Sequence, residues 1–109
     1  MKDDAELLMA YVKGDSEFDF TELVERHLPL VYSAAVRMVN EDVHLAQDVV
    51  QCVFTDLARK SSEVATRVSG DREALAGWLY TSTRFAAATA IRAIRRRKRY
   101  EDKAAAMSE

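Results

Sequence analysis

Residues 19–38 read DFTELVERHLPLVYSAAVRM, and this stretch decides the fold. Its apolar side chains recur every three or four residues, which is the period of one face of an α-helix. Asp19 suits the N-cap position, and Glu22 follows three residues later, as in a capping box. Because Pro29 lacks the backbone N–H that a helix uses, a kink or restart is expected near His27. The apolar face consists of Phe20, Leu23, Val24, His27, Leu28, Val31, Ala34, Ala35 and Met38.

Two further helices are predicted, one before this stretch and one after it. Residues 5–13 have an apolar side and precede Gly14, a residue type common at helix C-termini. Residues 42–60 place valine, alanine and leucine on one face, and Asp42 suits the N-cap position. The opposite face of this second helix is polar and carries Asp48, Gln51, Cys52, Thr55 and Arg59.

The remaining chain is predicted to contain one loop and one long helix. Residues 61–71 are polar, show no helical period and end in Gly-Asp, so they are expected to form a loop. A last helix begins near residue 71 or 72, with Leu75 and Leu79 on its apolar side, and the tail after Arg99 is expected to fray. The sequence therefore predicts an all-α fold, a compact bundle of about four helices in a single domain.

Length and composition exclude several classes of protein. The 109 residues suffice for one compact domain and are too few for two ordinary ones. Hydrophobic residues make up 49% of the chain, which argues against disorder, and 3 glycines and 1 proline are too few for a many-stranded β-sandwich. No apolar run reaches the roughly 20 residues of a membrane span, and the acidic N-terminus is unlike a signal peptide. A cytoplasmic protein without membrane association is therefore expected.

Charge is divided unevenly along the chain. Residues 1–56 carry 12 acidic and 4 basic side chains, a net charge of −8, whereas residues 57–109 carry 6 and 12, a net charge of +6. Five basic residues stand in a row at positions 95–99 of the last predicted helix. Such a run suits phosphate binding, and cations also suit the solvated C-terminal end of a helix. On a helical projection one side of this helix gathers Thr81, Arg84, Arg92, Arg95 and Arg99.

Three aromatic side chains lie near the start of the basic helix. Trp78 is expected to lie in the core. Tyr80 and Phe85 project away from the apolar side marked by Leu79, and one of them is expected to contact a base, because single-stranded bases stack on aromatic rings beside arginines.

The sequence contains no recognisable catalytic or metal-binding motif. His27 and His44 lie far apart on helical patterns, without a third ligand at metal-binding spacing, so both are expected to be structural. Cys52 has no partner for a disulfide and no neighbouring base, and it is expected to be a small packing residue. Because a Gly-rich phosphate loop and a nucleophile elbow are also missing, the sequence predicts no enzyme, no cofactor and no metal.

Three segments, taken in order, resemble region 2 of the sigma-70 family, specifically the extracytoplasmic-function (group IV) sigma factors of RNA polymerase. They are residues 20–32 (FTELVERHLPLVY), residues 46–54 (AQDVVQCVF), and Trp78-Leu79-Tyr80 leading into the arginine-rich helix. The likeness spans about residues 18–99, the expected core of a region 2 domain that occupies residues 1–109.

The resemblance implies two binding surfaces and a role in starting transcription. The helix over residues 42–60 would dock on the coiled coil of the RNA polymerase β′ subunit through Asp48 and Gln51, with Cys52 and Thr55 on the same face. The loop and the last helix would recognise and melt the minus-ten promoter element, holding its non-template strand and taking an extruded base into a loop pocket. An anti-sigma factor would regulate the domain. The implied DNA-binding residues are Ser61, Ser62, Tyr80, Thr81, Arg84, Phe85, Arg92, Arg95, Arg96 and Arg99.

The sequence also departs from the family pattern at several positions. Gln47 stands where the family often has Glu, and Cys52 replaces an acidic residue. Phe85 and Thr89 replace an Asn and an Asp of the recognition helix, which bears on base preference. The chain ends at Glu109 without the linker and region 4, so it is expected to be the N-terminal domain of a longer sigma factor, with a naturally truncated protein as the alternative.

A second interpretation is a non-enzymatic helical module that binds a protein partner and has a solvated basic tail. Salt-dependent DNA binding distinguishes the two interpretations, because affinity that comes from phosphate contacts falls as salt is raised.

Overall fold

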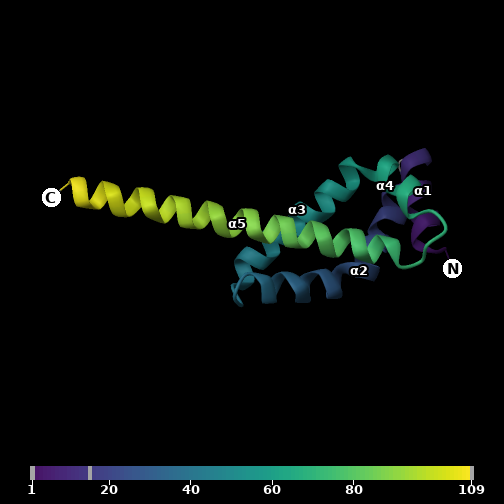
Figure 1. Ribbon diagram of the computed structural model, residues 1–109. Helices are drawn as coiled ribbons and strands as arrows, with labels where there is room; N and C mark the ends of the chain where they lie inside the picture. Colours follow the sequence, from purple (N-terminus) through teal and green to yellow (C-terminus); the bar gives the residue numbers. More distant parts are fainter. Residues whose placement is uncertain (1, 15, 109) are drawn as a thin grey trace.

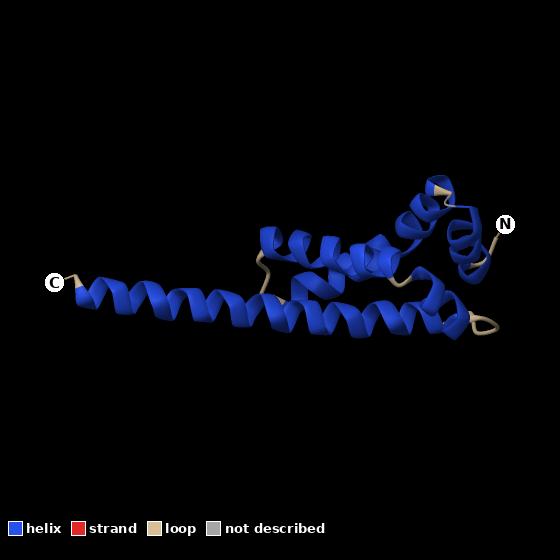
Figure 2. Cartoon of the chain, turned by 90° about the horizontal axis from the view of Figure 1, so that it is seen from above, coloured by secondary structure: helices blue, strands red, loops and turns tan. Residues whose placement is uncertain are grey.

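The computed structural model describes residues 2–14 and 16–108, and these residues form five helices and no strand (Figures 1 and 2). The all-α prediction is confirmed, with one helix more than the four expected. None of these helices is long and apolar enough to cross a membrane. The helices are α1 (Asp4–Gly14), α2 (Glu17–Met38), α3 (Val43–Arg59), α4 (Ser61–Val68) and α5 (Ala74–Met107).

Helix α2 begins three residues earlier than the sequence suggested. Its N-cap is Ser16, whose hydroxyl oxygen accepts a hydrogen bond from the backbone N–H of Asp19 at 3.3 Å, so the prediction of Asp19 as N-cap was wrong. The helix does not restart at Pro29 and stays helical to Met38. Figure 1 shows it changing direction along its length, the bend that a proline within a helix produces.

A sharp corner and a capped start position α3 against α2. Asn40 and Glu41 both adopt positive φ angles, of 59° and 66°, which turn the chain back within a few residues. Asp42 is the N-cap, as predicted, since its carboxylate accepts a hydrogen bond from the backbone N–H of Leu45 at 3.1 Å. Helix α3 then packs against both α2 and α5 and buries Ala46, Val49, Val50, Val53, Phe54 and Leu57.

The segment predicted as a polar loop contains helix α4, so that prediction was wrong. Val64, Ala65 and Val68 are all buried, and they occupy one face of two helical turns against α1 and α5. An eight-residue helix holds too few apolar positions to show a repeating period in the sequence. The chain between α4 and α5 is correspondingly short, and it turns at Gly70, whose φ of 84° is a left-handed conformation that suits glycine.

Helix α5 is the longest element and extends well beyond the bundle. Its 34 residues span about 51 Å at 1.5 Å per residue, and the described chain measures 63 × 23 × 22 Å. Leu75, Leu79, Thr83 and Ala87 are buried, whereas every residue from Ile94 to Ser108 is exposed. Figures 1 and 2 both show this second half of α5 projecting away from the other helices.

The predicted fraying after Arg99 does not occur, because the helix continues to Met107. The residues that follow Arg99 include Glu, Lys and three alanines and contain neither Gly nor Pro, so they favour helix.

A polar cluster joins α1 to α2. The two carboxylate oxygens of Asp4 contact different residues of α2: Oδ1 lies 3.0 Å from the Arg26 guanidinium, and Oδ2 lies 2.8 Å from Nε2 of His27. His27 is 8% exposed, which confirms the expected structural role. Because α1 also packs on α4, this cluster helps to hold three helices together.

Replacing Asp4 with Asn should destabilise the fold by about 1–2 kcal/mol. The change removes the negative charge that pairs with half-buried Arg26, and it weakens the hydrogen bonds that Asp4 makes with Arg26 and His27. Glu6→Gln is the matched control, since it removes an equally placed negative charge from the first turn of α1 at an exposed position, and it should cost about 0.5 kcal/mol or less. Urea denaturation measures both values. Equal losses would show that the cluster contributes nothing beyond the helix dipole.

Candidate functional site

The polar residues predicted on α3 form one exposed ridge. Asp48, Gln51, Cys52 and Thr55 are all exposed, as expected for one face of an amphipathic helix. The expectation that Cys52 is a small packing residue was wrong, because rotation by about 100° per residue places it away from the buried face of Val49 and Val53, and it is exposed.

The α3 ridge lies between two grooves of different character. On one side, the α2–α3 groove contains Gln51, Phe54 and Thr55 of α3 with Phe20 and Leu28 of α2, and its lining is almost entirely apolar. Leu28 is 39% exposed, and Phe18, which precedes this groove on α2, is 79% exposed. Exposed apolar side chains beside a polar ridge suit the docking of an amphipathic helix from a partner.

On the other side of the ridge, the α3–α5 groove contains Cys52, Asp56 and Lys60 of α3 or its C-cap, facing Phe85 and Thr89 of α5. Gln51 and Thr55 therefore adjoin one groove and Cys52 adjoins the other. Phe85 is 71% exposed, so a large aromatic ring faces solvent between charged and polar groups.

Four residues predicted to contact DNA come together in a third groove. This α2–α5 groove is lined by Thr81, Arg84, Phe85 and Arg92 of α5 and by Met38 of α2. All four α5 residues are exposed. Arginine and aromatic side chains along one groove can bind phosphates and unpaired bases of a single strand.

The other predicted arginines lie farther along α5, on its projecting half. Arg95, Arg96 and Arg99 are exposed there, and Arg92 donates a hydrogen bond to the Thr89 hydroxyl at 3.3 Å. Among the described residues, no acidic side chain forms an ion pair with a cation from position 92 to position 99. These charges are available to an anionic partner.

Ser61 and Ser62 do not join the arginines in one groove. Ser61 is half-buried and Ser62 is exposed at the first turn of α4, where the Ser62 carbonyl accepts a hydrogen bond from the Thr66 hydroxyl at 3.2 Å. The residue before them, Lys60, lines the α3–α5 groove with Phe85. The expected loop pocket is replaced by helix α4, whose buried residues face other helices.

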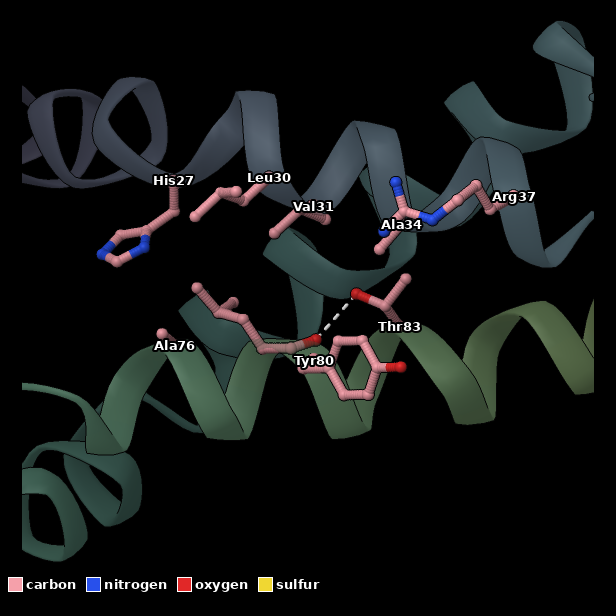
Figure 3. Close-up of a pocket in the computed structure, with 9 residues that line it drawn as sticks. His27, Leu30, Val31, Ala34, Arg37, Ala76, Tyr80 and Thr83 are labelled. Atoms are coloured by element: carbon pink, nitrogen blue, oxygen red, sulfur yellow. Dashed lines mark hydrogen bonds between the residues drawn. The ribbon is translucent and has the colours of Figure 1, made fainter.

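Sequence reasoning missed two residues of α2 that lie beside Tyr80. Tyr80 is 52% exposed and borders a pocket between α2 and α5, together with Leu30 and Arg37 (Figure 3). Leu30 is 70% exposed although it is apolar. Its position just after Pro29 and outside the apolar period of α2 was the signal that could have shown its exposure. Trp78, in contrast, is half-buried and packs against the core, as expected.

Potential metal ligands are scattered in this fold. In residues 2–14 and 16–108, no three His, Cys, Asp or Glu side chains gather closely enough to hold a metal ion. His44 is exposed near the start of α3, so its burial does not support the structural role expected for it.

Comparison with known proteins identifies the family. The family model for Sigma-70 region 2 matches residues 23–100, which is 78 of the 109 residues and extends from α2 into the projecting half of α5. No curated protein and no solved structure gave a significant match. The family is a non-enzymatic domain of transcription initiation factors, and it binds RNA polymerase core and promoter DNA. With the match covering well over half of its length, the chain belongs to the sigma-70 region 2 family, and its role is polymerase binding and promoter recognition.

Proposed function

We propose that the chain is the region 2 domain of an extracytoplasmic-function sigma factor, which docks on the β′ coiled coil and recognises and melts the minus-ten element. The observation that supports this most strongly is the placement of two unlike surfaces on one bundle. The α3 ridge with its apolar groove suits a protein helix, and the basic face of α5 suits DNA. We further propose that residues 1–109 act as one domain in the cytoplasm, with an anti-sigma factor as regulator by analogy with the family.

Docking on the coiled coil would use both the ridge and the α2–α3 groove. An amphipathic helix can place apolar side chains against Phe20 and Leu28 while its polar edge meets Gln51 and Asp48. The Asp48 carboxylate and the Gln51 amide supply orientation, because hydrogen bonds are directional and apolar contacts are not. Cys52 and Thr55 complete the proposed contact face.

Asp48→Ala and Gln51→Ala should each weaken binding to a purified β′ coiled-coil fragment about 5- to 10-fold, because each removes a polar contact near the centre of the proposed interface. The matched control is Ser33→Ala, an exposed position on α2 that lines none of the three grooves. Titration calorimetry measures the affinities. If both α3 variants bind as tightly as Ser33→Ala, docking does not use this ridge.

Melting of the minus-ten element would be driven by binding energy alone. Arginines hold the phosphates of the separated strand, and aromatic or polar side chains take up its bases, which offsets the stacking that the duplex loses. Arg84, Arg92 and Phe85 share one groove, so phosphate and base contacts can form together. Ser61 and Ser62 are proposed as further base contacts, because the adjoining Lys60 lines the groove that contains Phe85.

A further inference from the structure

The buried face of α5 continues beyond the bundle. Within the bundle this face is a row of buried residues four positions apart, Leu75, Leu79, Thr83 and Ala87. Ile91, the next residue of the row, still packs against the core. Continued in steps of three and four, the row crosses the projecting half of α5, where all residues are exposed and none of the described helices lies alongside (Figures 1 and 2). The exposed part of this face, which we call the α5 seam, consists of Ile94, Lys98, Glu101 and Ala105.

The α5 seam has the spacing of a surface that pairs with another helix. Its positions alternate steps of four and three residues, which is the repeat of helices that pack along their length. Ile94 is apolar, yet it is 41% exposed. Most of the stability of a helix in a protein comes from the packing of one face. A second helix along the seam would supply the packing that the bundle gives only to the first half of α5.

The two charged residues of the seam are complementary when two copies of α5 run antiparallel. In that arrangement Lys98 of each copy faces Glu101 of the other, and the same register places Ile94 opposite Ala105. Among the described residues, Glu101 forms no ion pair within its own chain. A parallel pair would instead place Lys98 against Lys98 and Glu101 against Glu101. The charges therefore favour the antiparallel arrangement.

The arginines of the projecting half lie mostly outside the seam. At 100° per residue, Arg92, Arg96 and Arg99 point about 130–170° away from the centre of the seam. Arg95 lies at the edge of the seam, where antiparallel pairing brings it close to Asp102 of the second copy. Within the described part of the chain, Asp102 has no ion-pair partner of its own. Pairing thus adds a contact between opposite charges and leaves three arginines free for an anionic partner.

We propose that the α5 seam pairs in antiparallel orientation with the same seam of a second copy of this chain, an interaction that goes beyond the functions proposed above and does not depend on them. The pair is symmetric, so each contact between Lys98 and Glu101 occurs twice. Charged seam residues fix the orientation at a cost in stability. The seam is only about 18 Å long, so the pair buries less than the roughly 1,200 Å² of stable complexes. The association is therefore weak and depends on protein concentration.

Charge reversal tests the pairing, with sedimentation equilibrium of the chain from about 10 μM to 1 mM as the measurement. The mass of the wild type should rise with concentration from the 12.3 kDa of one chain toward twice that value. Lys98→Glu and Glu101→Lys should each raise the dissociation constant about 5- to 30-fold, because each converts both contacts between opposite charges into contacts between like charges. Lys103→Glu is the matched control, since it makes the same charge change on the opposite side of α5, and it should alter the constant by about 2-fold or less.

Two rescue experiments show whether the lost contact joins two copies. An equimolar mixture of the Lys98→Glu and Glu101→Lys variants should associate at least as tightly as the wild type, because every charged seam residue then faces an opposite charge. A chain that carries both substitutions should also recover, since its two charges are exchanged and remain complementary in the antiparallel pair. In a parallel pair, neither single variant would lose affinity, because like charges already face each other in the wild type.

The contradicting outcomes are equally specific. A wild type that stays monomeric up to about 1 mM, or single variants that associate as tightly as Lys103→Glu, would overturn the proposal, as would a mixture that shows no rescue. Circular dichroism checks that each variant keeps its helices. If the seam instead binds a helix of RNA polymerase, the chain stays monomeric and Lys98→Glu weakens binding to the core enzyme relative to Lys103→Glu.

Discussion

Replacing Arg95 and Arg96 together with alanine should weaken the binding of minus-ten oligonucleotides about 30-fold at low salt. Both side chains are exposed on the projecting half of α5, and among the described residues neither has an acidic partner to lose. Their charge is therefore available for phosphates, and each charge-assisted contact contributes about 1 kcal/mol in an exposed site. Because phosphates carry no sequence information, the loss should be nearly the same for every oligonucleotide sequence.

Salt dependence makes this prediction specific. For a single strand, each lost phosphate contact makes the negative slope of log affinity against log salt shallower by about 0.7. The slope of the double variant should therefore be shallower than that of the wild type by about 1.4. Arg59→Ala with Arg67→Ala is the matched control, since it removes the same charge from residues that pair with acids on their own helices, Asp56 and Glu63. Unchanged affinity and slope in the Arg95 and Arg96 variant would favour a protein-binding module with a solvated basic tail.

Replacing Leu57 with alanine should destabilise the domain by about 2–5 kcal/mol, the largest effect expected for a single substitution here. Leu57 is 0% exposed near the end of α3, the helix that packs on both α2 and α5. The smaller side chain leaves a cavity that the surrounding helices cannot fill, because each is fixed by its other contacts. Since a domain of this size is stable by only about 5–15 kcal/mol, a substantial unfolded fraction is expected on mild heating.

Leu30→Ala is the control for Leu57→Ala, because it removes the same atoms from a position that is 70% exposed. Its effect on the free energy of unfolding should lie within about 0.5 kcal/mol of zero. Urea denaturation followed by circular dichroism gives both values. Similar losses for the two variants would contradict the placement of Leu57 in the core.

The helices that could be predicted from the sequence are those with several turns of regular pattern. The apolar period of α2 and the capping Asp42 of α3 depend on neighbours a few residues apart, so both were visible without the structure. Helix α4 could not be predicted from the sequence. Val64, Ala65 and Val68 are too few to show a helical period, and they become core residues only because α1 and α5 pack on them. The N-cap was misplaced for a similar reason, since Ser16 and Asp19 both suit a cap and geometry selects the first.

The candidate site, like the fold, could be predicted only where its residues lie on a single helix. The α3 ridge and the α5 arginines each lie on one helix, so helical geometry alone predicted that Asp48 and Gln51, or Arg84 and Arg92, share a face. The grooves between helices depend on how α2 bends and packs. The meeting of Leu30 and Arg37 with Tyr80 joins residues more than 40 positions apart, and no local pattern contains that information.

The projecting half of α5 places like charges close together in water. Arg95 and Arg99 are four residues apart on this half, a spacing at which equal charges repel and weaken a helix. Among the described helices, none packs on this part to compensate. A bound phosphate backbone would cancel the repulsion and so tighten the helix that binds it. Added salt then acts on this element in two opposite directions, raising its helicity when DNA is absent and loosening its hold on DNA when it is present.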